Sequence, residues 1–212
     1  VTITGGSYTW STGETTSSNQ VDEAGDYDVS YILPTGCSAS ATVSIAQELV
    51  KNANFDNGND GSFTSDYAYK PDVSGNSELV DDSGNNGYSV STSGQNVHSN
   101  FWGHDHTSGA GNFMLVNGHG NTLIVWKQTV RVLPNTTYYF SAWAMSLNSV
   151  NGPTNNAHLR FSVNGALIGS TAVLNNHGET SSSPDNWIRF YGTWTSGPTT
   201  TSADIYINNL QA

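Results

Sequence analysis

Apolar and polar residues alternate along most of the chain, and this alternation predicts β-strands. In segment 138–145 the apolar positions Tyr138, Phe140 and Ala142 fall on one parity. Successive side chains of a strand point to opposite faces, so such a segment has one buried and one exposed face. Similar runs cover residues 88–92, 97–102, 112–116, 123–132, 137–145, 158–164, 167–174, 187–194 and 203–208. The sequence has no helical period, which predicts an all-β fold.

A separate group of strands is predicted near the start of the chain, at residues 7–10, 27–31 and 38–43. The segment Ala46-Gln47-Glu48 follows them as a short hinge. We therefore divide the chain into two domains, 1–46 and 47–212. The first is so short that its core would be marginal, so we expect it to be less ordered than the second or to lean against it. The dipeptides Pro134-Asn135 and Asn164-Gly165 are typical of the turns of β-hairpins.

The segment Asp105–Gly118, DHTSGAGNFMLVNG, begins as a polar turn and becomes a strand. Asp105 and Ser108 are expected to bond nearby backbone amides, and Gly109 provides backbone freedom. The segment resembles the strand start of MAM domains. It is more similar to a bacterial surface module related to the jelly-roll carbohydrate-binding modules of families 4, 9 and 22. Segment 49–58 resembles the first strand of the same modules. The resemblance implies a jelly-roll β-sandwich for residues 47–212, although the paired aspartates that usually end the family's last strand are missing.

The N-terminal segments GGSYTWSTGETTSS and EAGDYDVSYILPTGCSASATVSI resemble the Ig-like repeats of large bacterial surface adhesins. The resemblance implies that residues 1–46 are the C-terminal part of such a repeat, with Tyr27 at the tyrosine-corner position. It also implies an extracellular or bacterial cell-surface location. Cys37 is the only cysteine. Family members carry a second cysteine on an earlier strand, so the partner of Cys37 could lie outside this chain. The alternative is a reduced, buried small residue.

Charge and hydropathy narrow the choice of partners. Seventeen acidic and six basic residues give a net charge of −11. Such a surface repels phosphate backbones and anionic lipids, so we expect no nucleic-acid partner. No apolar run reaches the roughly 20 residues that a membrane span needs, so we also expect no membrane insertion.

The acidic residues are distributed in a way that argues against an enzyme. A glycosidase needs two carboxylates about 5 to 10 Å apart across the sugar. No Asp or Glu occurs between His106 and Gly178, where most of the predicted strands lie. The sequence also lacks a nucleophile elbow, a phosphate-binding loop and a zinc-protease helix. We therefore expect a non-catalytic protein.

Two carboxylates are candidates for a structural calcium ion, which prefers six to eight oxygen ligands. The resemblance implies that Asp56 and Asp105 help to bind such a cation, and the alternative is that both acids cap turns. Zinc is a weaker candidate. His104 and His106 would share one face of a strand, but a third ligand would have to come from His98 or His119.

Aromatic and polar side chains that fall on the polar parity of the predicted strands suggest a sugar-binding face. Sugars offer flat apolar faces ringed by hydroxyl groups, so their sites combine aromatic rings with hydrogen-bonding side chains. If the apolar parity faces the core, one outer face collects most of the candidates. The predicted ligand-binding residues are Trp126, Gln128, Tyr139, Trp143, His158, Arg160, Arg189 and Tyr191.

These observations predict a non-catalytic polysaccharide-binding module of a secreted or surface-anchored bacterial protein, stiffened by calcium. The alternative is a structural or adhesive module of a surface adhesin or filament, whose sandwich contacts neighbouring protein modules. Loss of glycan binding on Trp143→Ala without unfolding would favour the first function.

Overall fold

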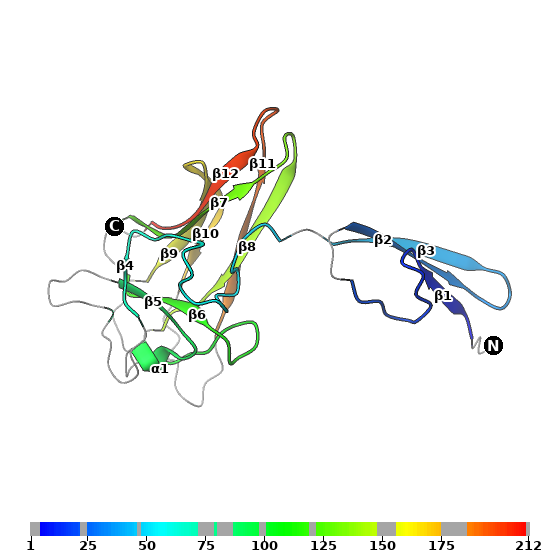
Figure 1. Cartoon of the computed structure of the whole chain (residues 1–212), viewed down its shortest axis with the longest axis horizontal. Helices are drawn as coiled ribbons and strands as arrows, with labels where there is room; N and C mark the ends of the chain where they lie inside the picture. The colour runs from blue at the N-terminus through cyan, green and yellow to red at the C-terminus, as the bar shows by residue number, and fades with distance from the viewer. Residues whose placement is uncertain are drawn as a thin grey trace. The chain divides into compact units, whose positions relative to one another are not determined.

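The protein folds into two compact units, Val1–Leu49 and Val50–Ala212, each built from β-strands (Figure 1). The computed structural model describes residues 5–21, 25–45, 48–71, 79, 87–97, 101–118, 122–147, 156–174 and 186–210. Within these residues there are twelve strands and one helical turn, α1 (Gly94–Val97). The predicted all-β fold is confirmed. None of the helical residues among them forms a segment long and apolar enough to cross a membrane.

The first unit is a three-stranded antiparallel sheet in the order β1 (Ser7–Trp10), β2 (Gly25–Ile32), β3 (Ser38–Ile45). Strands β2 and β3 pair in unbroken register, and the rings of Tyr8 and Tyr31 pack with centroids 4.6 Å apart. No described side chain in this unit is buried, so its sheet lacks a closed core. Cys37, in the β2–β3 turn, is exposed, so its interpretation as a buried residue is wrong. A disulfide partner outside the chain stays a prediction.

The second unit contains the remaining strands in three sheets. One sheet has the order β10 (Ala166–Val173), β9 (His158–Val163), β12 (Ser202–Asn209), β7 (Leu123–Arg131). The second pairs β11 (Ile188–Thr195) with β8 (Thr137–Ala144), and the third has the order β4 (Ala68–Tyr69), β5 (Gly87–Ser91), β6 (Phe113–Val116).

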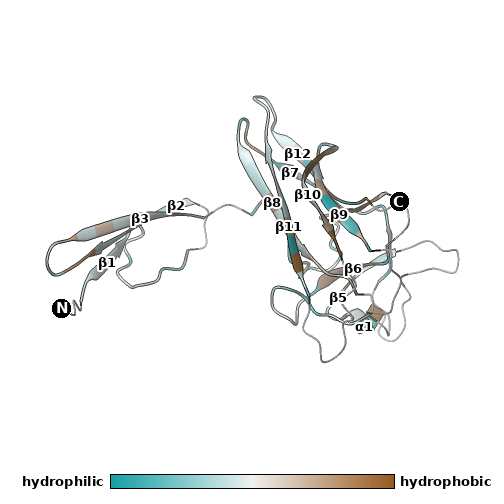
Figure 2. Cartoon of the chain, turned by 180° about the vertical axis from the view of Figure 1, so that it is seen from behind, coloured by the Kyte–Doolittle hydropathy of each residue, from teal (hydrophilic) through white to brown (hydrophobic). Residues whose placement is uncertain are grey.

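Three phenylalanines join the four-stranded sheet to the β8–β11 pair. Phe161 of β9 lies between Phe140 of β8 and Phe190 of β11, with ring centroids 6.3 and 4.8 Å apart, and all three are buried. The two layers therefore form a β-sandwich, and Figure 2 shows hydrophobic (brown) and hydrophilic (teal) residues along its strands. Because alternate side chains of β8 and β11 point away from these phenylalanines, the intervening residues lie on the outer face.

Most of the predicted strands are confirmed, but two segments differ. Residues 49–58, expected to be a strand, form consecutive turns closed by backbone hydrogen bonds from Phe55 to Asn52 and from Gly58 to Phe55. Asn52 and Phe55 both have positive φ, which interrupts an extended run. The prediction for 97–102 is also wrong where it can be judged, because Val97 ends α1 and Phe101 lies in a loop. Residues 98–100 lie outside the described residues.

The two turn signals have different outcomes. Asn164-Gly165 forms the predicted two-residue hairpin between β9 and β10, with φ of 51° and 83°. Both values are positive, as a type I′ turn requires. Pro134-Asn135 is also a turn, but it connects β7 to β8, which belong to different sheets. It therefore carries the chain from one layer of the sandwich to the other.

Candidate functional site: an aromatic face on β8 and β11

The pairing of β8 with β11 brings four of the predicted ligand-binding residues, and one serine, onto one surface. In the β8–β11 pair, Trp143 lies opposite Arg189, and Ser141 lies opposite Tyr191. Tyr139 is the next residue of this parity along β8. Their neighbours Phe140 and Phe190 are buried, so this parity is the outward one. We call this surface the aromatic face and define it by Tyr139, Ser141, Trp143, Arg189 and Tyr191.

Three large rings of the aromatic face are open to solvent. The exposed fractions are 53% for Tyr139, 44% for Trp143 and 58% for Tyr191. Tyr139 and Tyr191 stack on each other, with ring centroids 5.7 Å apart and planes inclined by 25°. Exposed aromatic rings of this size on one face are uncommon unless the surface binds something. The two tyrosines therefore form one stacked, solvent-exposed aromatic pair on the surface of β8 and β11.

Arg189 fixes the middle of the aromatic face. Its guanidinium carbon lies 5.6 Å from the centroid of the Tyr139 ring, within the range of a cation–π interaction. Its Nη2 also donates a hydrogen bond of 3.3 Å to Ser141 Oγ. The remaining guanidinium N–H groups stay available as donors beside the exposed rings.

The second ring position, Trp143, is held by a residue from a distant loop. His106 stacks on Trp143 with a centroid distance of 3.9 Å and an interplanar angle of 17°. It also meets the ring of Trp187 edge-on, at 5.8 Å. The contact of His106 with the aromatic face could not be inferred from local sequence. The described residues contain no group of three or more His, Cys, Asp or Glu side chains that could hold a metal ion. His98 and His119 of the weak zinc hypothesis lie outside the described residues.

Asp105 builds the loop that presents His106. Its carboxylate accepts hydrogen bonds from the amides of Thr107, Ser108 and Gly111, at 3.1, 2.7 and 2.9 Å, and from Ser108 Oγ. The backbone contacts expected for Asp105 and Ser108 are confirmed, and Gly109 has φ of 73°. Burial raises the pKa of the Asp105 carboxyl, but the hydrogen bonds from Ser108 and Gly111 together lower it below its usual value.

These contacts bear on the calcium prediction. A carboxylate has about four lone-pair positions, and the amide and hydroxyl donors around Asp105 occupy them. Asp105 therefore does not fit the role of a calcium ligand in this loop. Asp56 is exposed, and its carboxylate accepts a hydrogen bond from Asn54 Nδ2. Its backbone carbonyl accepts one from Asn112 Nδ2 at 3.3 Å. A calcium site at Asp56 stays a prediction.

Two predicted ligand-binding residues lie on the inner side of the sandwich instead. Trp126 of β7 is buried. It lies opposite Ile207 of β12, and Ile207 lies opposite Phe161 of β9, so all three side chains share the face that points to the core. Gln128 has the same parity and is also buried. Its side-chain amide forms hydrogen bonds with the backbone of Lys51 and Ser62. The assignment of both residues to the binding face is wrong, because the register with β12 turns their parity inward.

His158 and Arg160 lie on the opposite layer from the aromatic face. Both have the parity of β9 that points away from Phe161, and Arg160 Nε donates to the carbonyl of Ile168 at 3.3 Å. The expectation that one face gathers all eight residues is therefore wrong. The structure brings together Tyr139, Trp143, Arg189 and Tyr191, and it does not place His158 and Arg160 beside them.

Comparisons with known proteins add little to this geometry. No protein-family model matches the chain, and no curated protein matches it. A search of solved structures finds one described as "Structural basis for the promiscuous specificity of the carbohydrate-binding modules from the beta-sandwich super family". The two chains are 14% identical, and the overlap covers 97% of this chain and 84% of the other at a TM-score of 0.35. A superposition this loose carries no argument, so the site rests on its own geometry.

Proposed function

We propose that this protein binds polysaccharide without catalysis, through the aromatic face on β8 and β11. The observation that carries the proposal is the alignment of three solvent-exposed rings, Tyr139, Trp143 and Tyr191, on one strand pair. The carbon-bound hydrogens of a sugar ring form a flat apolar patch that stacks on such a ring. The proposal includes an extracellular or cell-surface location, where such ligands occur.

The spacing of the rings favours a chain of sugars over a single sugar. Tyr139 and Trp143 are four residues apart on β8, which corresponds to about 13 Å along an extended strand. That length exceeds one pyranose ring, so the two positions can contact different sugars of the same chain. Arg189, between them, offers N–H donors to ring hydroxyls or to the glycosidic oxygens.

The composition of the aromatic face is consistent with binding and not with hydrolysis. None of its five residues is an acid, and a glycosidase needs a pair of carboxylates flanking the bond that it cleaves. The described acids nearest in sequence, Asp105 and Asp204, are each engaged by several donors. Among the described residues, the aromatic face can therefore hold a glycan but contains no acid that could protonate a leaving group.

Affinity electrophoresis in gels that contain β-glucan or mannan, followed by calorimetric titration, tests the proposal. Tyr139→Ala, Trp143→Ala and Tyr191→Ala should each weaken binding about tenfold, which corresponds to the 1.4 kcal/mol of a moderate hot spot. Leu133→Ala is the matched control, because Leu133 is 68% exposed but lies in the turn region before β8. Unchanged thermal unfolding of each variant excludes a folding defect.

Two results would overturn the proposal. Full binding by all three ring variants would remove the aromatic face from the site. Absence of binding by the wild-type protein across a broad neutral and acidic panel would favour the structural or adhesive alternative. In that case, light scattering after size-exclusion chromatography would measure whether the exposed rings support association between protein modules.

A further inference from the structure

The outer face of the four-stranded sheet collects basic residues in a strongly acidic chain. The net charge of the protein is −11, and it has only six Lys and Arg residues. Lys127 and Arg131 of β7 alternate with the buried Gln128 and Val130, so they point outward. Arg160 of β9 has the outward parity of its strand. Half of all the bases therefore lie on this one surface, which we call the basic face.

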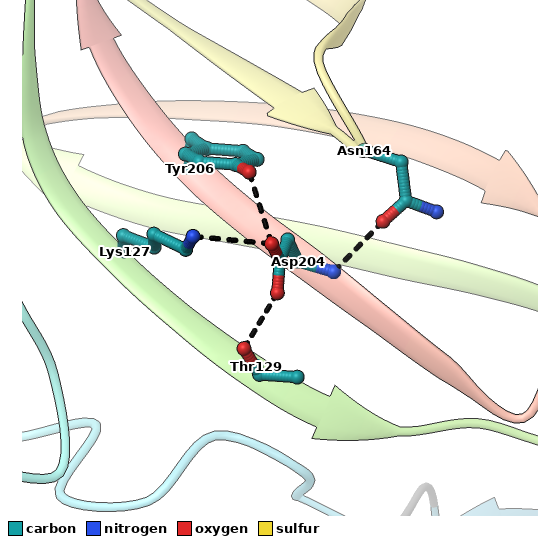
Figure 3. Close-up of polar contacts among 5 residues, drawn as sticks. All are labelled: Lys127, Thr129, Asn164, Asp204 and Tyr206. Carbon is teal, nitrogen blue, oxygen red and sulfur yellow. Dashed lines mark hydrogen bonds and ion pairs between the residues drawn. The ribbon is translucent and has the colours of Figure 1, made fainter.

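Asp204 is the one acid on the four strands of the basic face, and its negative charge is balanced by Lys127. Its carboxylate accepts hydrogen bonds from Thr129 Oγ1 at 2.5 Å and Tyr206 OH at 3.1 Å, and it pairs with Lys127 Nζ at 3.1 Å. Figure 3 shows these side chains gathered around Asp204 on the same side of β7 and β12. The Thr129 and Lys127 contacts hold the pKa of the Asp204 carboxyl below its usual value, so it stays ionised and balances Lys127.

The two arginines of the basic face have no acidic partner among the described residues. Arg160 uses Nε for the carbonyl of Ile168, which orients the guanidinium and leaves its terminal N–H groups as donors. Arg131 is exposed at the far end of β7. Within the described ranges, neither guanidinium forms an ion pair. A further acid, Asp66, lies at the edge beside β7, where its carboxylate accepts the amide of Ile124.

The bases form a diagonal row. Lys127 and Arg131 are four residues apart on one strand, or about 13 Å. Lys127 pairs with Tyr206, which pairs with Ser162, two residues from Arg160. Two strand spacings and two residues place Lys127 and Arg160 about 12 Å apart. The half-buried ring of Tyr206 lies between them, with Lys127 Nζ 5.1 Å from its centroid.

From this arrangement we propose that the basic face is a second ligand surface, and that it takes an anionic polysaccharide bearing carboxylate or sulfate groups. Duplex DNA carries a charge about every 1.7 Å, far denser than a row of bases about 12 to 13 Å apart. A polysaccharide with widely spaced acidic groups matches Arg131 and Arg160, the ends of the row, whose charges Asp204 does not balance. One of its sugar rings can lie on Tyr206. The arginine forks suit the planar carboxylate or the sulfate group.

This inference concerns a different surface and a different sugar chemistry from the aromatic face. The basic face belongs to the β10-β9-β12-β7 sheet, and the aromatic face belongs to the β11-β8 pair. Ligand binding at the basic face and ligand binding at the aromatic face can therefore be tested independently of each other. An acidic polymer should bind through Arg131 and Arg160 with a strong salt dependence, whereas a neutral polymer should bind through the rings with little salt dependence.

The test uses the whole chain with alginate or polygalacturonate as the acidic probe and β-glucan as the neutral one. The double variant Arg131→Gln/Arg160→Gln should lose at least about tenfold in affinity for the acidic probe and should show a shallower salt dependence. Its binding of the neutral probe should not change. The variant Arg131→Lys/Arg160→Lys should recover part of the affinity, because it restores the charge. Lys70→Gln removes one base outside the basic face, and it serves as the charge-matched control for the single variants Arg131→Gln and Arg160→Gln.

Several results would overturn the inference. One is unchanged binding of the acidic probe by the double glutamine variant, and another is absence of such binding by the wild-type protein. An equal loss in Lys70→Gln would mean that overall charge, and not the basic face, governs binding. Light scattering provides the last check. A wild-type dimer that dissociates in the double glutamine variant would identify a second copy of the chain as the occupant.

Discussion

The side-chain amide of Gln128 is hydrogen-bonded to both backbone groups of Lys51, a residue 77 positions earlier in the chain. Gln128 Oε1 accepts the Lys51 amide at 2.7 Å, and Gln128 Nε2 donates to the Lys51 carbonyl at 3.0 Å. The same Nε2 donates to the carbonyl of Ser62 at 3.0 Å. The side chain of Gln128 thus forms the hydrogen bonds that a neighbouring strand would otherwise form with the backbone of the turns in residues 50–62.

Gln128→Leu should therefore destabilise the second unit. The change removes the side-chain partner of part-buried backbone groups of Lys51 and Ser62. A group that is left unsatisfied away from water costs about 1 to 3 kcal/mol. We expect the free energy of unfolding to fall by about 2 to 4 kcal/mol in urea titrations. Thr193→Ala, an exposed change on β11, should cost less than about 0.5 kcal/mol. Equal stability of the two variants would contradict this role of the Gln128 hydrogen bonds.

Acidification should weaken the Asp105 loop. The pKa of this carboxyl lies below its ordinary value of 3.8 in the folded protein. Its contribution to stability is therefore complete above the unfolded pKa and is lost as the pH falls through the folded pKa. Asp105→Asn should lower the free energy of unfolding by about 1.5 to 3 kcal/mol near neutral pH, because charge-assisted hydrogen bonds are lost. The difference from wild type should shrink near pH 3, and a constant difference would refute this account.

Removal of calcium should leave the Asp105 loop unaffected, because amide and hydroxyl donors already surround that carboxylate. A structural ion at a hundred times its Kd would add about 2.7 kcal/mol to the free energy of unfolding. We expect thermal melts with added calcium and with EDTA to differ by the same amount in wild type and in Asp105→Asn. A calcium-dependent rise in Tm that disappears in Asp105→Asn would reinstate Asp105 as a ligand.

Gly169 should resist substitution far more than Gly165. Both have positive φ, 64° and 83°, so an alanine is strained at either position. A Cβ on Gly169 would also fall 2.9 Å from the carbonyl carbon of Tyr191 and closer still to its oxygen, whereas Gly165 has open space. Gly169→Ala should cost about 3 kcal/mol or more, from strain and overpacking together. Gly165→Ala should cost about 1 to 2 kcal/mol, from backbone strain alone. Chemical denaturation of both variants checks the difference, and similar costs would contradict the close approach of β10 to β11.

The strands of the second unit could be predicted because their side chains alternate. The apolar parity of β8, marked by Phe140, and that of β11, marked by Phe190, correctly indicated which residues of each strand face outward. That information was enough to group Tyr139, Trp143, Arg189 and Tyr191. The Asp105 turn was also predictable, because its hydrogen bonds join residues within six positions of one another.

The remaining site residues depended on contacts that no local pattern encodes. Parity indicates which residues of one strand share a face, but it does not indicate the sheet to which the strand belongs. Arg160 and Arg189 have the same alternation, yet they lie on opposite layers because β9 pairs with β12 and β11 pairs with β8. Gln128 looked like a ligand donor because it is polar, and its true partners are backbone groups far away in the sequence.

Tyr139 and Tyr191 lie on an open surface, and this has a kinetic consequence. Under the proposed function, a sugar stacked there would keep its other side in water, so it would bury limited apolar area and form few contacts that slow its dissociation. Each encounter would be brief, and a single copy would hold its polymer weakly. Firm retention would then come from avidity, as several copies engage repeats of one glycan chain and each bound copy raises the effective concentration for the next.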